Sequence, residues 1–336
     1  MMGKVTSLDV AEKAGVSRSA VSRVFTPGAS VSKTTAAKVR KAAAALGYRP
    51  NVLARSLITG RSRIIGLVVA YLENQFYPEA IERLSKALQA EGYHVLVFMA
   101  SNDHAATQTV IDELLDYQVD AIIAASVGLS NDLTKRCEGL GIPIVLFNRH
   151  QYDERLTSVT SDNVAGGRKL ADFLIAGGHE RIAHIAGWEG ASTQIDREAG
   201  FMAGLKAAGH RLFARGVGNF NFETAKNAAR EMFVAPERPD AVFVANDHMA
   251  FAVMDVLRYE LGLRVPQDVS VVGYDDVTLS HWPSYDLTTV RQPANQMVAA
   301  TVAALLARLS DEDAAPRRIT LDGPLIIRSS ARKPKR

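Results

Sequence analysis

From residue 64 onward the sequence alternates between two kinds of segment. Short runs of β-branched and apolar residues are followed by longer stretches with helical periodicity. The expected strands lie at 64–70, 93–98, 119–125, 143–147, 181–187, 239–245 and 269–274, and the first expected helix at 79–90. Strands separated by crossover helices are typical of parallel sheets covered on both faces. Because one sheet of ordinary size holds fewer such units, we expect two similar doubly wound lobes.

Charge is distributed unevenly along the 336 residues, whose formal net charge is +3. Residues 1–63 hold 12 lysines and arginines against Asp9 and Glu12, so this segment carries +10 and the remainder carries −7. A basic head on a mildly acidic body favours a polyanionic partner, because each phosphate neutralised by a cation releases a counterion.

Cysteine content and hydropathy bear on the compartment. Cys137 is the only cysteine, so neither a disulfide framework nor a thiolate metal cluster can form within one chain. The first 15 residues are interrupted by charges, and no apolar run approaches the ~18 residues that cross a bilayer. We therefore expect a cytoplasmic protein without membrane insertion.

Residues 8–24, LDVAEKAGVSRSAVSRV, carry the pattern of two short helices joined by a tight turn. Val10 and Ala11 give the first helix a small apolar face that a second helix can cross closely. Gly15 ends that helix where a positive φ is needed, and Ser17 can cap the helix that follows. The segment therefore predicts a helix-turn-helix.

The second helix of this unit turns Val21 and Val24 inward. Its opposite face presents Arg18, Ser19, Ser22 and Arg23. Such a helix can enter the major groove of DNA, where Arg pairs with guanine and Ser contacts bases or phosphate. A third helix is expected to begin after Ser32 and to run to Leu46, with Gly47 as its stop.

The segment 46–63 differs from both neighbours because it contains Gly and Pro and no acidic residue. Asn51 can cap a short helix with Ala54 and Leu57 on one side, while Arg55 and Arg61 supply charge near phosphates. We interpret the segment as a linker with a second DNA element. The alternative for Leu57 is an ordinary apolar anchor against the body.

Polar side chains suited to a hydroxyl-rich ligand follow several expected strands. They are Asn148 and Arg149, Asn246 and Asp247, and Asp275 and Asp276. Ligands of open α/β sheets bind beyond the carboxyl ends of the strands, so the set fits a carbohydrate or an organic acid. Phe76, Tyr77 and Phe220 can pack on the apolar face of a ring. Any single member can equally be a strand-end cap.

These motifs together resemble the lactose-repressor (LacI/GalR) family over the whole chain. The resemblance rests on DVA, AGVS, VSRV, GYRPN and ARSL in the first 57 residues, and on SDNVAGG, GHERIAHIAG, DREAGF, VANDHMAF, PQDVSVVGYDD and LTTVRQP further on. It implies an α/β two-lobed periplasmic-binding-protein-like effector domain with an N-terminal all-α helix-turn-helix DNA-binding domain. The expected boundaries are 1–48 for the headpiece, 49–62 for the hinge and 63–336 for effector binding and dimerisation.

The resemblance also assigns residues. The candidate DNA contacts are Thr6, Ser17, Arg18, Ser19, Ser22, Arg23, Ser32, Asn51, Ala54, Arg55 and Leu57, with Leu57 as a minor-groove wedge. The candidate effector contacts are Arg197, Asn246 and Asp275 at the core, with Phe76, Tyr77, Thr193, Phe220, Asn148, Arg149 and Asp162 around them. Ala20 and Thr26 depart from the family's usual Thr and Asn.

We therefore expect a regulator, most plausibly a repressor, whose homodimer binds near-palindromic double-stranded operator DNA and whose affinity follows a sugar or sugar acid. A solute receptor for a transporter and a hydrolase using Asp275 and Asp276 are the alternatives. Neither a cofactor nor a metal is expected: His179, Glu180 and His184 miss the zinc-protease spacing by one residue.

Overall fold

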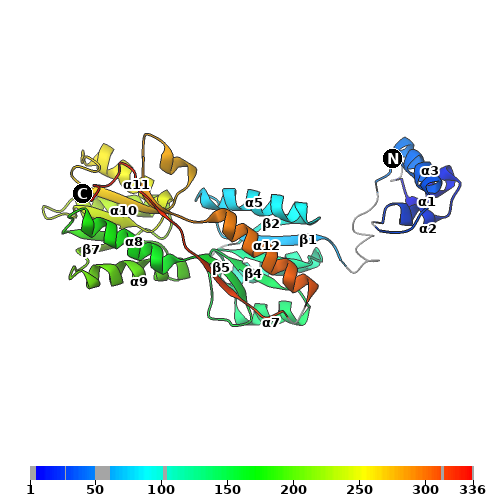
Figure 1. Ribbon diagram of the computed structural model, residues 1–336, viewed down its shortest axis with the longest axis horizontal. Helices are drawn as coiled ribbons and strands as arrows, with labels where there is room; N and C mark the ends of the chain where they lie inside the picture. The colour runs from blue at the N-terminus through cyan, green and yellow to red at the C-terminus, as the bar shows by residue number, and fades with distance from the viewer. Residues whose placement is uncertain (1–4, 27, 50–60, 101–103, 312–313, 335–336) are drawn as a thin grey trace. The chain divides into compact units, whose positions relative to one another are not determined.

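A computed structural model describes residues 5–26, 28–49, 61–100, 104–311 and 314–334. The chain divides into two compact units, Met1–Ser62 and Arg63–Arg336. The first unit is helical, and the second contains two parallel sheets (Figure 1).

The described residues of the first unit form three helices: α1 (Ser7–Ala14), α2 (Arg18–Val24) and α3 (Lys33–Leu46). They pack around a small core that includes Val10, Val21 and Val39, none of which is exposed. Gly15 and Gly47 end α1 and α3 in the left-handed conformation, each at a φ of 65°. The three helices, the caps Ser17 and Ser32 and the stops Gly15 and Gly47 are those predicted from the sequence. The capping of α1 by Thr6 was not predicted.

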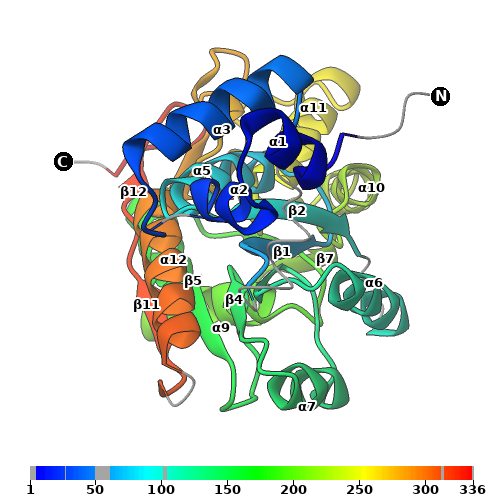
Figure 2. The ribbon, with the colours of Figure 1, turned by 90° about the vertical axis from the view of Figure 1, so that its right-hand side faces the viewer.

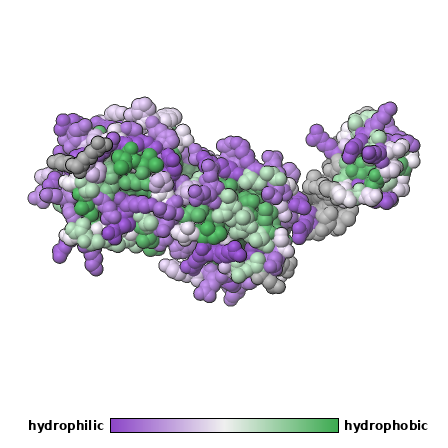
Figure 3. Space-filling view, in the orientation of Figure 1, coloured by the Kyte–Doolittle hydropathy of each residue, from purple (hydrophilic) through white to green (hydrophobic). Residues whose placement is uncertain are grey.

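The second unit begins with lobe one, whose six-stranded sheet has the order β11-β5-β4-β3-β1-β2. Its strands are β1 (Ile64–Val69), β2 (His94–Met99), β3 (Ala121–Ala125), β4 (Ile144–Phe147), β5 (Thr157–Ser161) and β11 (Arg318–Leu321). Helices α5 (Phe76–Ala90) and α12 (Ala294–Ser310) cover one face, while α6 (His104–Asp116) and α7 (Asn131–Gly139) cover the other (Figure 2). Hydrophobic residues gather where α12 crosses the visible face of this lobe (Figure 3).

Lobe two repeats the plan with the order β12-β10-β9-β8-β6-β7. Its strands are β6 (Ile182–Ala186), β7 (Ala214–Val217), β8 (Ala241–Val244), β9 (Ser270–Asp275), β10 (Thr288–Arg291) and β12 (Leu325–Ile326). Helices α8 (Asn163–Ala176) and α9 (Ser192–Ala207) lie on one face. On the other face lie α10 (Phe222–Phe233) and α11 (Asp247–Asp255). A π-helical turn, Val256–Glu260, continues α11, and a 3-10 turn, Thr278–His281, follows β9.

The chain passes between the lobes three times: from β5 to α8, from β10 to α12 and from β11 to β12. In sequence, lobe two is thereby inserted into lobe one. The last two strands of the chain's sheets, β11 and β12, belong to different lobes. This arrangement leaves the carboxyl ends of both sets of parallel strands near the crossovers, where ligands of such sheets bind.

All seven strands predicted from the sequence are present, within two residues at their ends. The first predicted helix begins earlier than expected, at Phe76 instead of Glu79. The Asn74 side chain accepts the Phe76 N–H, and Pro78 is compatible with a first helical turn. Phe76 and Tyr77 therefore lie on a helix and not in a loop. Among the described residues no helix is both long and apolar enough to span a bilayer.

Candidate functional site

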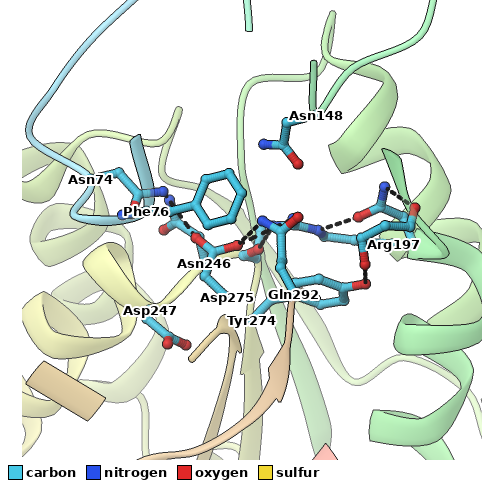
Figure 4. Close-up of polar contacts among 12 residues, drawn as sticks. Asn74, Phe76, Asn148, Arg197, Asn246, Asp247, Tyr274, Asp275 and Gln292 are labelled. Carbon is cyan, nitrogen blue, oxygen red and sulfur yellow. Dashed lines mark hydrogen bonds and ion pairs between the residues drawn. The ribbon is translucent and has the colours of Figure 1, made fainter. Parts of the chain in front are cut away.

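A buried ion pair between Arg197 on α9 and Asp275 at the end of β9 forms the centre of the site (Figure 4). Arg197 Nη2 lies 3.3 Å from Asp275 Oδ1, and both side chains are almost fully buried. The guanidinium also donates to Asn163 Oδ1 at 2.8 Å and to the Ala245 carbonyl at 2.7 Å. It stacks 3.7 Å from the centre of the Tyr274 ring. These contacts hold the charge in one orientation.

Asp275 is also held from outside lobe two. Gln292, in the β10–α12 crossover, donates its amide N–H to Oδ1 at 2.7 Å, and Asn74 of lobe one donates to Oδ2 at 2.9 Å. Burial raises the pKa of Asp275, and the Arg197 guanidinium opposes that rise. One carboxylate thus joins both lobes and a crossover.

Two polar atoms beside this carboxylate remain available to a ligand. Asn246 caps α11 by accepting the Met249 N–H, which fixes its amide nitrogen as the outward group. Gln292 donates to a carboxylate, which fixes its oxygen as the outward group. Neither Asn246 Nδ2 nor Gln292 Oε1 has a hydrogen-bond partner among the described residues, although both are buried. One donor and one acceptor are therefore presented together.

Lobe one faces this cluster with aromatic rings and one amide. Phe76 stacks on Phe147 at a centroid distance of 6.1 Å, and Tyr77 packs edge-on against Phe76. The Tyr77 hydroxyl contacts Ser126 and accepts from the Asn148 amide at 2.9 Å. Asn148 points toward the Asp275 cluster in Figure 4, and within the described part of the chain its Oδ1 has no hydrogen-bond partner.

The other candidate effector contacts include Phe220, Arg149 and Thr193, and all three are buried. Phe220 is 7% exposed and packs on Gly187, where a Cβ atom would come within 2.2 Å of the ring. The Arg149 guanidinium of lobe one lies 5.2 Å from the Trp188 ring of lobe two. Thr193 is buried in the first turn of α9. Thr193 precedes Arg197 by one turn of the same helix.

Three carboxylates near the site have other partners. Asp162 caps α8 by accepting the Ala165 N–H at 2.9 Å, so a structural task accounts for its side chain. Asp247 accepts from the Val277 N–H and from the hydroxyls of Ser280 and Thr289. These bonds join the start of α11 to β10 and to the segment that follows β9. Asp276 pairs with Arg291 and Arg328. Asp275 and Asp276 thus point to different partners, as expected for consecutive residues.

The two histidines that resemble a zinc-protease motif, His179 and His184, also have structural partners. His184 lies in β6 and bonds the Phe243 carbonyl, while His179 contacts Asp240 and Arg332. No group of three or more potential metal ligands occurs among the residues that the structure describes.

In the first unit α2 presents Arg18, Ser19, Ser22 and Arg23 on its exposed face. Arg18 Nε donates to Ser7 Oγ at 3.0 Å, which orients its guanidinium along the α1–α2 edge. Thr6, Ser17 and Ser32 are the N-caps of the three helices, and each is exposed. Asn51, Ala54, Arg55 and Leu57 lie outside the described residues.

Asn74 and Gln292 are absent from the sequence-based candidates. Gln292 follows β10, a strand whose sequence TTVR gives no strong periodicity, so the rule that found Asn246 and Asp275 was not applied there. Asn74 reaches the site from a loop of lobe one, and no local pattern marks it.

Comparison with known proteins identifies the chain. It is 32% identical over 332 residues to the HTH-type transcriptional repressor PurR of Vibrio vulnificus, covering 98% of this chain and 99% of that protein. The chain belongs to the LacI family of bacterial regulatory proteins. The model of that family matches residues 6–51, and a periplasmic binding protein-like domain matches residues 171–331.

Other LacI-family members match over similar lengths. The ribose operon repressor of Escherichia coli K12 is 31% identical over 97% of this chain and 99% of its own length. The structure of the lac repressor dimer bound to operator and the anti-inducer ONPF has 29% identity, a TM-score of 0.86 and coverage of 98% of this chain and 99% of that one. The structure of the CelR–cellobiose complex has 32% identity, a TM-score of 0.73 and coverage of 98% and 100%. The family and the fold predicted from the sequence are confirmed, and the relatives are transcriptional regulators.

Proposed function

We propose that this LacI-family regulator represses transcription and releases or tightens its hold on DNA when a small polyhydroxy metabolite binds between the two lobes. The observation that carries the proposal is the buried cluster of Arg197, Asp275, Asn246 and Gln292, which faces Phe76 and Asn148 of the other lobe. A ligand that contacts both lobes stabilises one lobe orientation over others, and such differential affinity is what shifts a conformational equilibrium.

The chemistry of the cluster supports a sugar or a sugar acid. A carboxylate and an amide oxygen accept from hydroxyls, an amide nitrogen donates to them, and aromatic rings pack on the apolar face of a pyranose or furanose. Arg149 adds a cation on the rim of lobe one. The CelR structure contains cellobiose, which agrees with this ligand class.

On DNA we propose a homodimer whose two α2 helices read the halves of a near-palindromic operator. The division into a headpiece (1–48), a hinge (49–62) and an effector domain (63–336) belongs to this proposal, as does the role of Leu57 as a wedge. Because the operator lies in the cytoplasm of a bacterium, the protein acts there.

Selection of duplexes from a random library, followed by fluorescence anisotropy with the selected site, tests DNA recognition. Arg18→Ala is expected to weaken binding about 10- to 100-fold, because Arg reads base edges. Arg168→Ala removes the same charge from α8 and is the matched control, with little change expected. Failure to enrich any sequence would contradict specific binding.

A thermal-shift screen of sugars, sugar acids and nucleobases tests the effector site. A ligand that binds only the folded protein raises the melting temperature by mass action. The expected ligand loses its shift in Asn246→Ala and alters operator affinity in the parent protein. A compound that shifts melting equally in parent and variant does not use this site.

A further inference from the structure

A network of polar side chains lies in lobe two. It begins at the buried His184 in β6 and ends at the exposed Glu189. His184 is fully buried, stacks on the Phe243 ring at 4.7 Å and places Nδ1 2.9 Å from the Phe243 carbonyl oxygen. Because a carbonyl only accepts, Nδ1 carries the proton. Burial lowers the pKa of His184 to about 4, so the ring is neutral near pH 7 and Nε2 is an acceptor.

This tautomer fixes the orientation of Gln194 on α9. The Gln194 amide nitrogen lies 3.1 Å from His184 Nε2 and 2.8 Å from Glu198 Oε2, so it donates to both. Its oxygen is left to accept the Gly187 N–H at 2.6 Å. Gln194 is 1% exposed, and turning its amide over would break all three contacts.

The outer part of this network, formed by Glu198 and Arg215, holds the loop 187–190 from the other side. Glu198 pairs with Arg215 through contacts of 2.6 and 3.0 Å, and Arg215 pairs with Glu189 at 2.9 Å. The loop 187–190 is therefore held by its backbone at Gly187 and by its side chain at Glu189. The Arg215–Glu198 pair is only partly exposed, whereas Glu189 is largely exposed, so the contact to Glu189 is the weaker of the two.

The residues of this loop reach the site. Trp188 lies between the two anchors and meets the Arg149 guanidinium of lobe one. Gly187 supports Phe220, whose ring would collide with any larger residue there. A displacement of the loop would therefore move both the aromatic rim of lobe two and one contact between the lobes.

We propose that His184 and Gln194 are positioning residues, which set the loop 187–190 and thereby the Trp188–Arg149 contact and the place of Phe220. They touch no ligand themselves. The step from loop position to effector affinity rests on the proposed function, whereas the step from His184 and Gln194 to loop position does not.

The test uses Trp188 as its own reporter in full-length protein. The chain has two tryptophans, so Trp282→Phe leaves Trp188 as the single emitter. Gln194→Met keeps the side-chain length and removes all three hydrogen bonds. In ligand-free protein we expect a shifted Trp188 emission maximum and acrylamide quenching that rises about twofold or more, since the loop loses its inner anchor.

Gln89→Met, on the exposed part of α5, is the matched control and is expected to leave the emission and the quenching unchanged. Arg215→Met removes the outer anchor at a partly exposed position and is expected to change both in the same direction, by less. It keeps the proposal testable if Gln194→Met does not fold.

A folded Gln194→Met protein with a lowered melting temperature but the parent's Trp188 emission and quenching would overturn the proposal. The network would then be structural only. Because no effector or operator enters the measurement, this outcome is independent of whether the proposed function holds.

Discussion

The two lobes share a sheet order but contribute differently to the site. In lobe two the central cation, Arg197, is held by three acceptors and a ring. Its partner Asp275 accepts from Arg197 within lobe two, from Gln292 in the crossover and from Asn74 of lobe one. Lobe one contributes mainly rings, packed against its own core, and reaches across through Asn74. Lobe two therefore presents a preorganised polar surface, and lobe one acts as an apolar cover.

This difference suggests an order of events. A ligand that docks on lobe two meets groups whose conformational entropy has already been lost, so little of the binding free energy is spent on ordering them. The closing of lobe one then depends on few polar contacts and can respond to the ligand. Rigidity in one lobe and a small number of contacts from the other are compatible with a switch.

Removing the central cation tests this contrast most strongly. Arg197→Met is expected to lower the free energy of unfolding by about 3 to 5 kcal/mol, because it leaves Asp275 buried without its positive partner. Urea denaturation of the purified protein measures the change. The exposed pair of Arg168 and Asp172 is the control, and Arg168→Met is expected to cost less than about 1 kcal/mol. Equal losses in the two variants would contradict a special role for lobe two.

The rigidity of lobe two also depends on the close crossing of α8 and α9. A Cβ atom at Gly200 would lie 2.0 Å from the Val164 carbonyl oxygen, so Gly200→Ala must separate the helices. We expect a loss of about 3 kcal/mol in unfolding free energy. At Gly139 in α7 a Cβ meets open space, and Gly139→Ala is expected to be neutral or slightly stabilising. Thermal denaturation of both variants makes the comparison.

Acidification is expected to weaken lobe two through His184. Burial lowers its pKa in the folded protein to about 4, below the ordinary value of 6.5, so the unfolded chain takes up the proton first as the pH falls. The unfolding free energy therefore declines from about pH 6.5 to pH 4, by about 2 kcal/mol from this group. His184→Phe, which can still stack on Phe243, should lack this part of the decline. An unchanged pH profile in that variant would assign the effect elsewhere.

The smallest expected effect concerns the bond by which Asn74 of lobe one holds Asp275 of lobe two. Asn74→Ala removes the cross-lobe bond to Asp275 and is expected to favour the open arrangement by about 1 kcal/mol. Asn74→Asp keeps an acceptor for the Phe76 N–H but sets two carboxylates against each other, so it should open the lobes further. The contrast between the variants separates capping of α5 from lobe closure.

Energy transfer between dyes on Gln89→Cys and Lys206→Cys reports the opening, since both positions are exposed and lie on different lobes. Burial raises the pKa of Cys137 to about 11, so the native thiol should resist labelling. Identical transfer efficiency in parent, Asn74→Ala and Asn74→Asp proteins would show that the bond does not control closure.

The sequence reveals elements whose signal is local. Strands such as Ile64–Val69 and Ala121–Ala125 are buried on both faces and read as continuous apolar runs. By contrast β5, with the sequence TSVTS, and β10, with TTVR, are polar segments that become strands only through their neighbours in the sheet. Such tertiary context cannot be derived from periodicity.

The site residues, too, could be predicted where their signal is local and were missed where it depends on tertiary context. Asn246 and Asp275 were found because they follow predicted strands, and the resemblance added Arg197, which lies inside a helix. Gln292 was missed together with β10, and Asn74 because its partner lies 201 residues away along the chain. Asp162, which the resemblance also supplied, caps α8.

The threefold passage of the chain between the lobes also has a consequence for biosynthesis. β11 and α12 are the last parts of lobe one to leave the ribosome, after nearly all of lobe two. At ~5 to 20 residues per second lobe one waits on the order of ten seconds with the β5 edge and the α12 face of its sheet uncovered. Lobe two, which then lacks only β12, can pair most of its strands during that interval. Chaperones are therefore expected to meet the incomplete lobe one.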